Sequence, residues 1–191
     1  MSSELMPDLK QYFEKIYLVS CYDTKDRLEA TFSHLKENGI EPELFIAPFK
    51  YYFPHFHKFN TENVWPGKLS LACAYEQLFQ KCILENTKTA LFIEDDVLLM
   101  DGWQDRIKVE WELDNWWYVV KADAQTHFFG MKQEAMKEYL NRFAMNFNSI
   151  DFQVNMLKSV RTSDCIAKQR SIEGVTPSAI DVESDKYKLE F

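Results

Sequence analysis

The sequence lacks the features that mark membrane proteins, secreted proteins and zinc modules. It has no apolar run long enough to span a membrane and no N-terminal signal segment. None of its four cysteines forms a Cys-x-x-Cys pair, so the usual spacing of structural zinc ligands is missing. We therefore interpret the cysteines as reduced thiols and expect a cytoplasmic protein, from a bacterium or a virus-infected host cell.

Positive charge is also scarce. The chain has 22 Lys and Arg against 30 Asp and Glu, a formal net charge of −8, which argues against indiscriminate nucleic-acid binding. Residues 121–170 differ, because eight Lys and Arg outnumber five Asp and Glu there, and such a surface could meet phosphates. The sequence has no Gly-rich phosphate loop and no Ser-His-Asp spacing typical of a hydrolase.

What the sequence does contain is a large apolar fraction in alternating segments. Hydrophobic residues make up 46% of the 191 positions, enough for one globular domain over 1–191. Residues 16–20 and 43–47 predict strands, and Gly39 predicts the left-handed end of a helix between them. The apolar stripe of that helix is Leu28, Thr31, Phe32 and Leu35. This β-α-β order predicts an α/β fold with a mostly parallel sheet flanked by helices.

The remainder of the chain continues this alternation. We expect helices at 68–85, 132–143 and 150–157, and strands at 91–93, 116–120, 127–131 and 164–167. A polar tail begins at residue 176.

Residues 48–67 form an aromatic-rich segment with three prolines and no clean period, which predicts an ordered loop. His55 and His57 have no nearby third ligand, so surface or packing roles are favoured over a metal site. The aromatic side chains could stack on a sugar or a base, or cover a sheet edge; they are Tyr51, Tyr52, Phe53, Phe56 and Trp65.

Three acids follow the most apolar strand, in the stretch TALFIEDDVLLMDGW. Residues 91–93 read as a strand buried on both faces, and Glu94, Asp95 and Asp96 come directly after it. Adjacent carboxylates repel one another, and a magnesium or manganese ion would relieve that repulsion. Open α/β sheets bind ligands at the carboxyl ends of their strands. The stretch therefore predicts either a metal-phosphate site or a solvated acidic turn.

Four segments in the same order resemble the glycosyltransferase family 25 proteins of lipooligosaccharide biosynthesis. The third is very like the family's Leu-Ile-Leu-Glu-Asp-Asp-Val signature, and the resemblance covers roughly residues 13–175. The segments are IYLVSCYDTKDRLEATFSHLKENGIEPELFIA, LSLACAYEQLF, ALFIEDDV, and SIDFQVNML with CIAKQRSIEG.

This resemblance implies a GT-A, Rossmann-like fold and a metal-dependent, inverting transfer from a nucleotide sugar, usually a UDP-sugar, to an acceptor hydroxyl. By position, Asp96 with Glu94 would hold a manganese or magnesium ion on the donor's phosphates. Asp95 would contact the nucleotide, and Arg27 would bind the donor's base or phosphate. Arg27 could instead be a solvated helix charge.

Two later segments complete what the resemblance implies. Asp151 would be the base that takes the acceptor proton, with a helix first-turn acid as the alternative. Gln169 and Ser171 match a late polar pair of the family; Gln169 is expected to bind substrate, and closing the core is the alternative for the pair. The chain departs from the family at Ala74-Tyr75, where the family has Ser-His. His127 could take over that role or be a late metal ligand, but a core histidine is the favoured interpretation.

The acceptor stays open. A lipid-linked or surface saccharide is usual for the family, and a protein or a hydroxymethylated base in viral DNA are alternatives. A non-catalytic nucleotide-sugar-binding relative and a phosphoryl or nucleotidyl transferase are the competing classes.

Overall fold

The computed structural model of the protein describes residues 9–21, 25–47, 66–105, 119–121, 127–143, 150–161 and 166–169. The strands are β1 (Lys15–Cys21), β2 (Glu43–Ala47), β3 (Thr89–Glu94), β4 (Val97–Leu99), β5 (Val119–Lys121), β6 (Phe128–Lys132), β7 (Ser159–Arg161) and β8 (Ala167–Gln169). The helices are η1 (Leu9–Gln11), α1 (Lys25–Glu37), α2 (Pro66–Leu84), α4 (Gln133–Phe143) and α5 (Ile150–Asn155).

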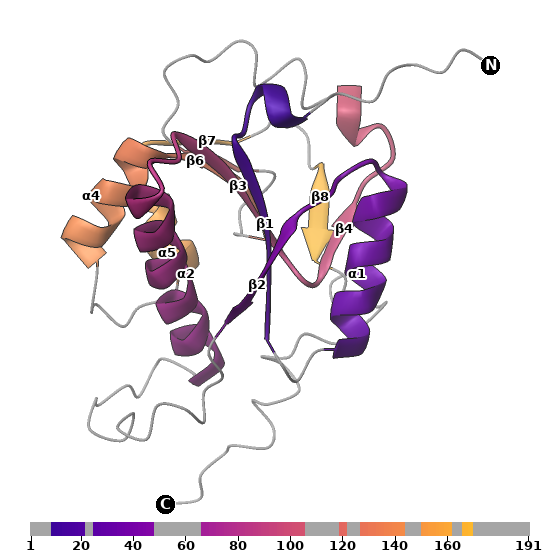
Figure 1. Ribbon diagram of the computed structural model, residues 1–191, viewed down its shortest axis with the longest axis horizontal. Helices are drawn as coiled ribbons and strands as arrows, with labels where there is room; N and C mark the ends of the chain where they lie inside the picture. Colours follow the sequence, from indigo (N-terminus) through magenta and orange to yellow (C-terminus); the bar gives the residue numbers. More distant parts are fainter. Residues whose placement is uncertain are drawn as a thin grey trace, which may run out of the picture.

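Six of these strands form the central sheet, in the order β2-β1-β3-β6-β5-β7, while β4 and β8 form a separate two-stranded sheet (Figure 1). β1 pairs in parallel with both β2 and β3, and β5 pairs in parallel with β7. β6 is antiparallel to both of its neighbours, β3 and β5, so it runs against the other five strands. The expected mostly parallel α/β sheet is therefore confirmed.

The first β-α-β unit follows the expectation closely. Gly39 adopts a φ of 72°, a left-handed conformation that glycine takes without strain. The N–H of Ile40 donates to the carbonyl of Leu35 at 2.9 Å, and both side chains are buried in one cluster. The left-handed helix end predicted at Gly39 is therefore confirmed.

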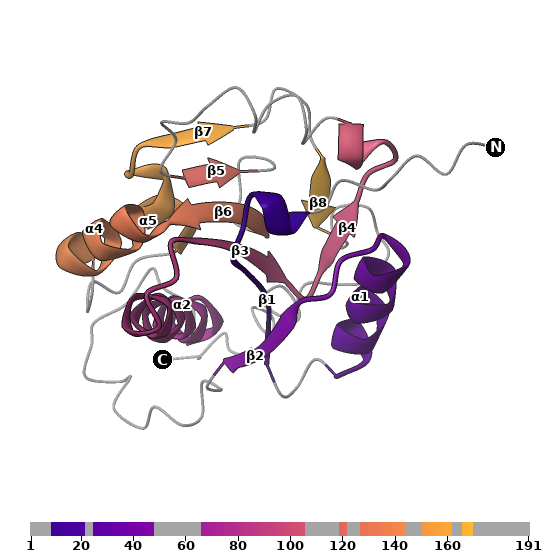
Figure 2. The same ribbon diagram turned by 45° about the horizontal axis from the view of Figure 1, so that its top comes forward.

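Helices cover both faces of the central sheet, as the second view shows (Figure 2). Leu91 and Ile93 of β3 pack into a cluster shared with α1, β4 and β8. Ala90 and Phe92 point to the opposite face and pack into a second cluster, shared with α2, α4 and α5. Burial on both faces explains why β3 is a continuous apolar run rather than an alternating one.

Several boundaries differ from the sequence-based prediction. α2 begins at Pro66 rather than Lys68, because proline suits the first turn of a helix. Phe32 is 41% exposed and lies outside the core, although the predicted stripe of α1 included it. β7 was not predicted, and the last strand lies at Ala167–Gln169 rather than 164–167. Strands of three residues are too short for an apolar pattern to reveal.

Some expectations concern residues that the structure does not describe. The loop at 48–65, with His55 and His57, is one of them, and the tail from residue 176 is another. Among the helices that the structure describes, none is both long enough and apolar enough to cross a membrane.

Candidate metal centre at the end of β3

The acid triplet lies at the carboxyl edge of the sheet, at the turn between β3 and β4. Glu94 is the last residue of β3, and Asp95 and Asp96 form the turn. After this turn β4 leaves the large sheet and pairs with β8. All three acids therefore lie where open α/β sheets bind their ligands.

Asp95 is held from several directions and is almost fully buried. Ser20 at the end of β1 donates its hydroxyl to Oδ2 of Asp95 at 2.6 Å, and Nη2 of Arg27 pairs with Oδ1. The backbone carbonyl of Asp95 accepts a hydrogen bond from the Thr31 hydroxyl at 2.6 Å. The backbone N–H of Asp95 donates to the carbonyl of Val19 at 3.1 Å. These bonds aim the Asp95 carboxylate at α1.

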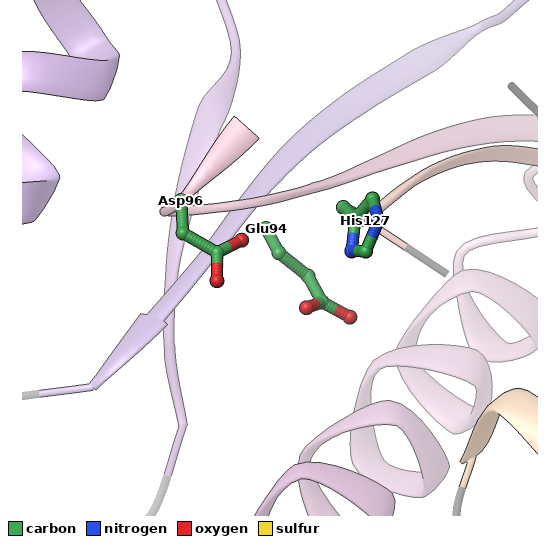
Figure 3. A group of neighbouring side chains, drawn as sticks. All are labelled: Glu94, Asp96 and His127. Atoms are coloured by element: carbon green, nitrogen blue, oxygen red, sulfur yellow. The ribbon is translucent and has the colours of Figure 1, made fainter. Parts of the chain in front are cut away.

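Asp96 belongs to a different group, which it forms with Glu94 and His127. Each of the three residues offers one ligand atom, and these atoms lie within 4.8 Å of one another. Figure 3 shows the Glu94 side chain between those of Asp96 and His127. His127 and Asp96 are each 4% exposed. Two carboxylates and one imidazole are a ligand set that suits manganese and similar divalent ions.

Backbone pairing explains how a histidine that is far away in sequence reaches this group. The N–H of Glu94 donates to the carbonyl of His127 at 2.8 Å, which continues the β3–β6 ladder by one step. Because β6 is antiparallel to β3, the residue just before β6 lies at the carboxyl end of β3. The sequence interpretation of His127 as a late metal ligand fits this position.

The electrostatics of the group favour a cation. The pKa of Glu94 is raised well above its ordinary value, first by burial and then by the negative charges of Asp96, Asp151 and Asp95. The positive charge of Arg27 acts in the opposite direction. Nη1 of Arg27 lies 3.8 Å from Oδ2 of Asp96. A divalent ion would stabilise the charged carboxylates, so the residues present fit such an ion.

Tyr75 completes the group from the side of α2. Its hydroxyl donates to Oε1 of Glu94 at 3.3 Å, and the side chain is fully buried. The sequence interpretation noted this position only as a departure from the family's Ser-His. The contact itself depends on how α2 lies against the sheet, which no local pattern encodes.

The other predicted site residues lie around this centre. Asp151 is in the first turn of α5, and its charge raises the pKa of both Glu94 and Tyr75. Gln169 pairs through its backbone with Val97, the residue after Asp96, while its side chain is outside the described part. Ser171 also lies outside it. The structure thus brings the predicted positions together, and their individual roles remain predictions.

Taken together, the chain is an α/β protein with a mostly parallel, helix-flanked sheet and an acidic centre at the end of a middle strand. Two solved structures share this fold. One is a glycosyltransferase involved in the glycosylation of the major capsid of PBCV-1, with a TM-score of 0.52, 11% identity, and coverage of 90% of this chain and 99% of that one. The other is A197 from STIV, with a TM-score of 0.50, 14% identity, and coverage of 81% and 85%.

At these identities the likeness concerns the fold alone. No family model matches the chain, and no curated protein matches its sequence.

Proposed function

We propose that the protein is a metal-dependent, inverting glycosyltransferase of the family 25 type, which moves a hexosyl or pentosyl group from a UDP-sugar to an acceptor hydroxyl. One observation carries this proposal. Glu94, Asp96 and His127 converge at the carboxyl end of β3, beside Arg27 and Asp151, in a fold shared with a glycosyltransferase. Glu94 and Asp96 belong both to the motif that carries the resemblance and to this group of side chains.

In this proposal Glu94, Asp96 and His127 hold a manganese or magnesium ion. When bound, the ion neutralises the charge that develops on the departing diphosphate. Arg27 adds a second positive charge at the same edge of the sheet, and in this proposal it meets a donor phosphate or the base. Asp95 keeps the guanidinium of Arg27 in place and is itself predicted to contact the nucleotide. Gln169 is predicted to bind substrate from β8.

The transfer itself needs one base. The acceptor oxygen bonds to the anomeric carbon, the bond from that carbon to the phosphate oxygen breaks, and the electron pair leaves with the nucleoside diphosphate. The acceptor proton then goes to Asp151. Its place near Glu94 and the partial exposure of its side chain support this role, because a base must reach both the centre and an incoming acceptor.

The test is release of UDP from a panel of UDP-sugars in the presence of manganese. The panel is run alone, with saccharide acceptors and with hydroxymethylated DNA, so that the acceptor class is read from the same assay. We expect Asp96→Asn to reduce turnover at least about 100-fold, since it removes a ligand of an ion that contributes several kcal/mol to the transition state. The matched control is Asp101→Asn, an exposed acid five residues further on, which should leave turnover unchanged.

If Asp96→Asn released UDP as fast as the unmodified protein, the assignment of Asp96 as a metal ligand would be wrong. Release of sugar 1-phosphate in place of UDP would indicate transfer of the uridylyl group and overturn the glycosyltransferase proposal.

A further inference from the structure

Tyr75 is a buried polar group whose position in the core is fixed by aromatic rings. Its ring centroid lies 5.8 Å from that of Phe79, 6.0 Å from that of Phe92 and 5.5 Å from that of Phe129. These partners come from α2, β3 and β6, so the ring is in contact with both the helix layer and the sheet. Aromatic contacts in this range are favourable and restrict the ring to one orientation. The hydroxyl therefore has a defined place at the end of the cluster nearest the acids.

That hydroxyl is directed at the acid group, because the O–H of Tyr75 donates to Oε1 of Glu94 at 3.3 Å. A carboxylate has about four lone-pair sites, so this bond leaves places on Glu94 for a cation.

We propose that Tyr75 is a positioning residue for the candidate metal centre, where its hydroxyl holds the Glu94 carboxylate so that Asp96 and His127 can share a divalent ion with it. This inference rests on the metal dependence in the proposed function. Hydrogen bonds that orient metal ligands typically change ion affinity by about 10- to 100-fold when they are removed. At 3.3 Å the Tyr75–Glu94 bond is longer than most bonds between oxygens, so we expect the lower end of that range.

The experiment is calorimetric titration of the whole protein with manganese chloride, without substrate. Tyr75→Phe keeps the ring and its packing and removes only the hydroxyl. We expect it to bind manganese about tenfold more weakly than the unmodified protein, with a urea unfolding midpoint close to that of the unmodified protein.

Tyr139→Phe is the matched control. Tyr139 is another fully buried tyrosine in the same cluster, in edge contact with Phe79, but its hydroxyl donates to Gln153 rather than to the acid group. Its loss leaves a buried amide oxygen without that donor, so this variant should lose stability and keep its manganese affinity.

The possible outcomes separate the two proposals. Equal manganese affinity in Tyr75→Phe and the unmodified protein would overturn the role of Tyr75 and leave the metal centre standing. Equal weakening in Tyr75→Phe and Tyr139→Phe would also overturn it, because the effect would then come from general packing. If the unmodified protein bound no manganese, both the metal dependence and the role of Tyr75 would be overturned.

Discussion

At the scale of single residues, three adjacent acids have three different surroundings. Glu94 continues the alternation of β3 and points to the side of α2, where Tyr75 meets it. Asp95 turns toward α1 and is bound by Ser20 and Arg27. Asp96 lies with Glu94 and His127. Because the strand alternates and then turns tightly, Asp95 holds the turn against β1 and α1, while Glu94 and Asp96 are the candidate metal ligands.

This division predicts unequal effects of two neighbouring substitutions on stability. Asp95→Asn should lower the free energy of unfolding by about 3 kcal/mol, because breaking a buried ion pair leaves the guanidinium of Arg27 poorly compensated. Asp96→Asn should change it by less than about 1 kcal/mol, since it also relieves repulsion with Glu94. Urea unfolding without added metal compares the two. A larger loss for Asp96→Asn would show that Asp96, rather than Asp95, anchors the turn.

The residues of the candidate centre were only partly predictable from the sequence. The acid run at the end of an apolar strand is visible locally and left a metal-phosphate site or an acidic turn open, and the family resemblance then predicted Glu94 and Asp96 as ligands. His127 was recognised as one option among several, since its place depends on β6 running antiparallel to β3. The contact of Tyr75 with Glu94 was missed, because it depends on the lateral placement of α2.

At the scale of elements, α1 binds the segment from Asp95 to Trp103 through polar side chains on one face. Arg27 and Thr31 contact Asp95, Nε2 of His34 accepts a hydrogen bond from the N–H of Leu99 at 3.0 Å, and Oδ1 of Asn38 accepts one from Nε1 of Trp103 at 2.9 Å. Arg27, Thr31 and His34 are spaced by four and three positions, so they share one side of α1, and Asn38 directly follows the last residue of the helix. α1 therefore holds the acidic turn and β4 together.

Thr31 gives the cleanest test of this role for α1. Its side chain is fully buried, and Thr31→Val keeps its shape while removing the donor to the Asp95 carbonyl. We expect a loss of about 1–3 kcal/mol in the free energy of unfolding, because a buried carbonyl then has one donor fewer. Urea denaturation measures this loss. Thr31→Ser, which retains the hydroxyl, should be more stable than Thr31→Val, and a Thr31→Val variant as stable as the unmodified protein would contradict a role for this hydrogen bond.

The sequence predicted most elements well and the shortest ones poorly. β2 matches its predicted bounds, because its branched and aromatic residues are bounded by turn signals on each side. α1 was predicted as an apolar stripe, and its polar contacts with the acidic turn became visible only once the turn was placed beside it. β7 and β8 depend on pairing with distant strands, which local composition does not reveal.

At the scale of the whole molecule, the cluster between the central sheet and α2, α4 and α5 contains Tyr17, Cys82 and Tyr139, and Cys73 lies half-buried on α2. Burial raises the pKa of Cys82 from 9.0 to about 11, and burial with the charge of Glu76 does the same for Cys73 on α2. Burial also raises the pKa of Tyr17 and Tyr139. The folded protein therefore keeps protons at alkaline pH that the unfolded chain would release.

The sign of the pH dependence follows directly. These groups contribute their full stability below about pH 9, and the contribution is lost as the pH rises through their folded-state pKa values. We expect the free energy of unfolding to fall by about 1 kcal/mol per thiol between about pH 7 and pH 10. Urea midpoints across that range measure it. A Cys73→Ala, Cys82→Ala double variant should show a shallower decline, and a stability that rose toward pH 10 would contradict the assignment.

The reversed direction of β6 has a consequence for how the two halves of the chain are joined. Among the described strands of the large sheet, β2, β1 and β3 come from the first half of the sequence and β6, β5 and β7 from the second, and the β3–β6 ladder is the seam between them. Glu94 and Asp96 lie on one side of that seam and His127 on the other. A shared cation would be a reversible cross-link between the halves, so occupancy of the centre and cohesion of the sheet would rise and fall together.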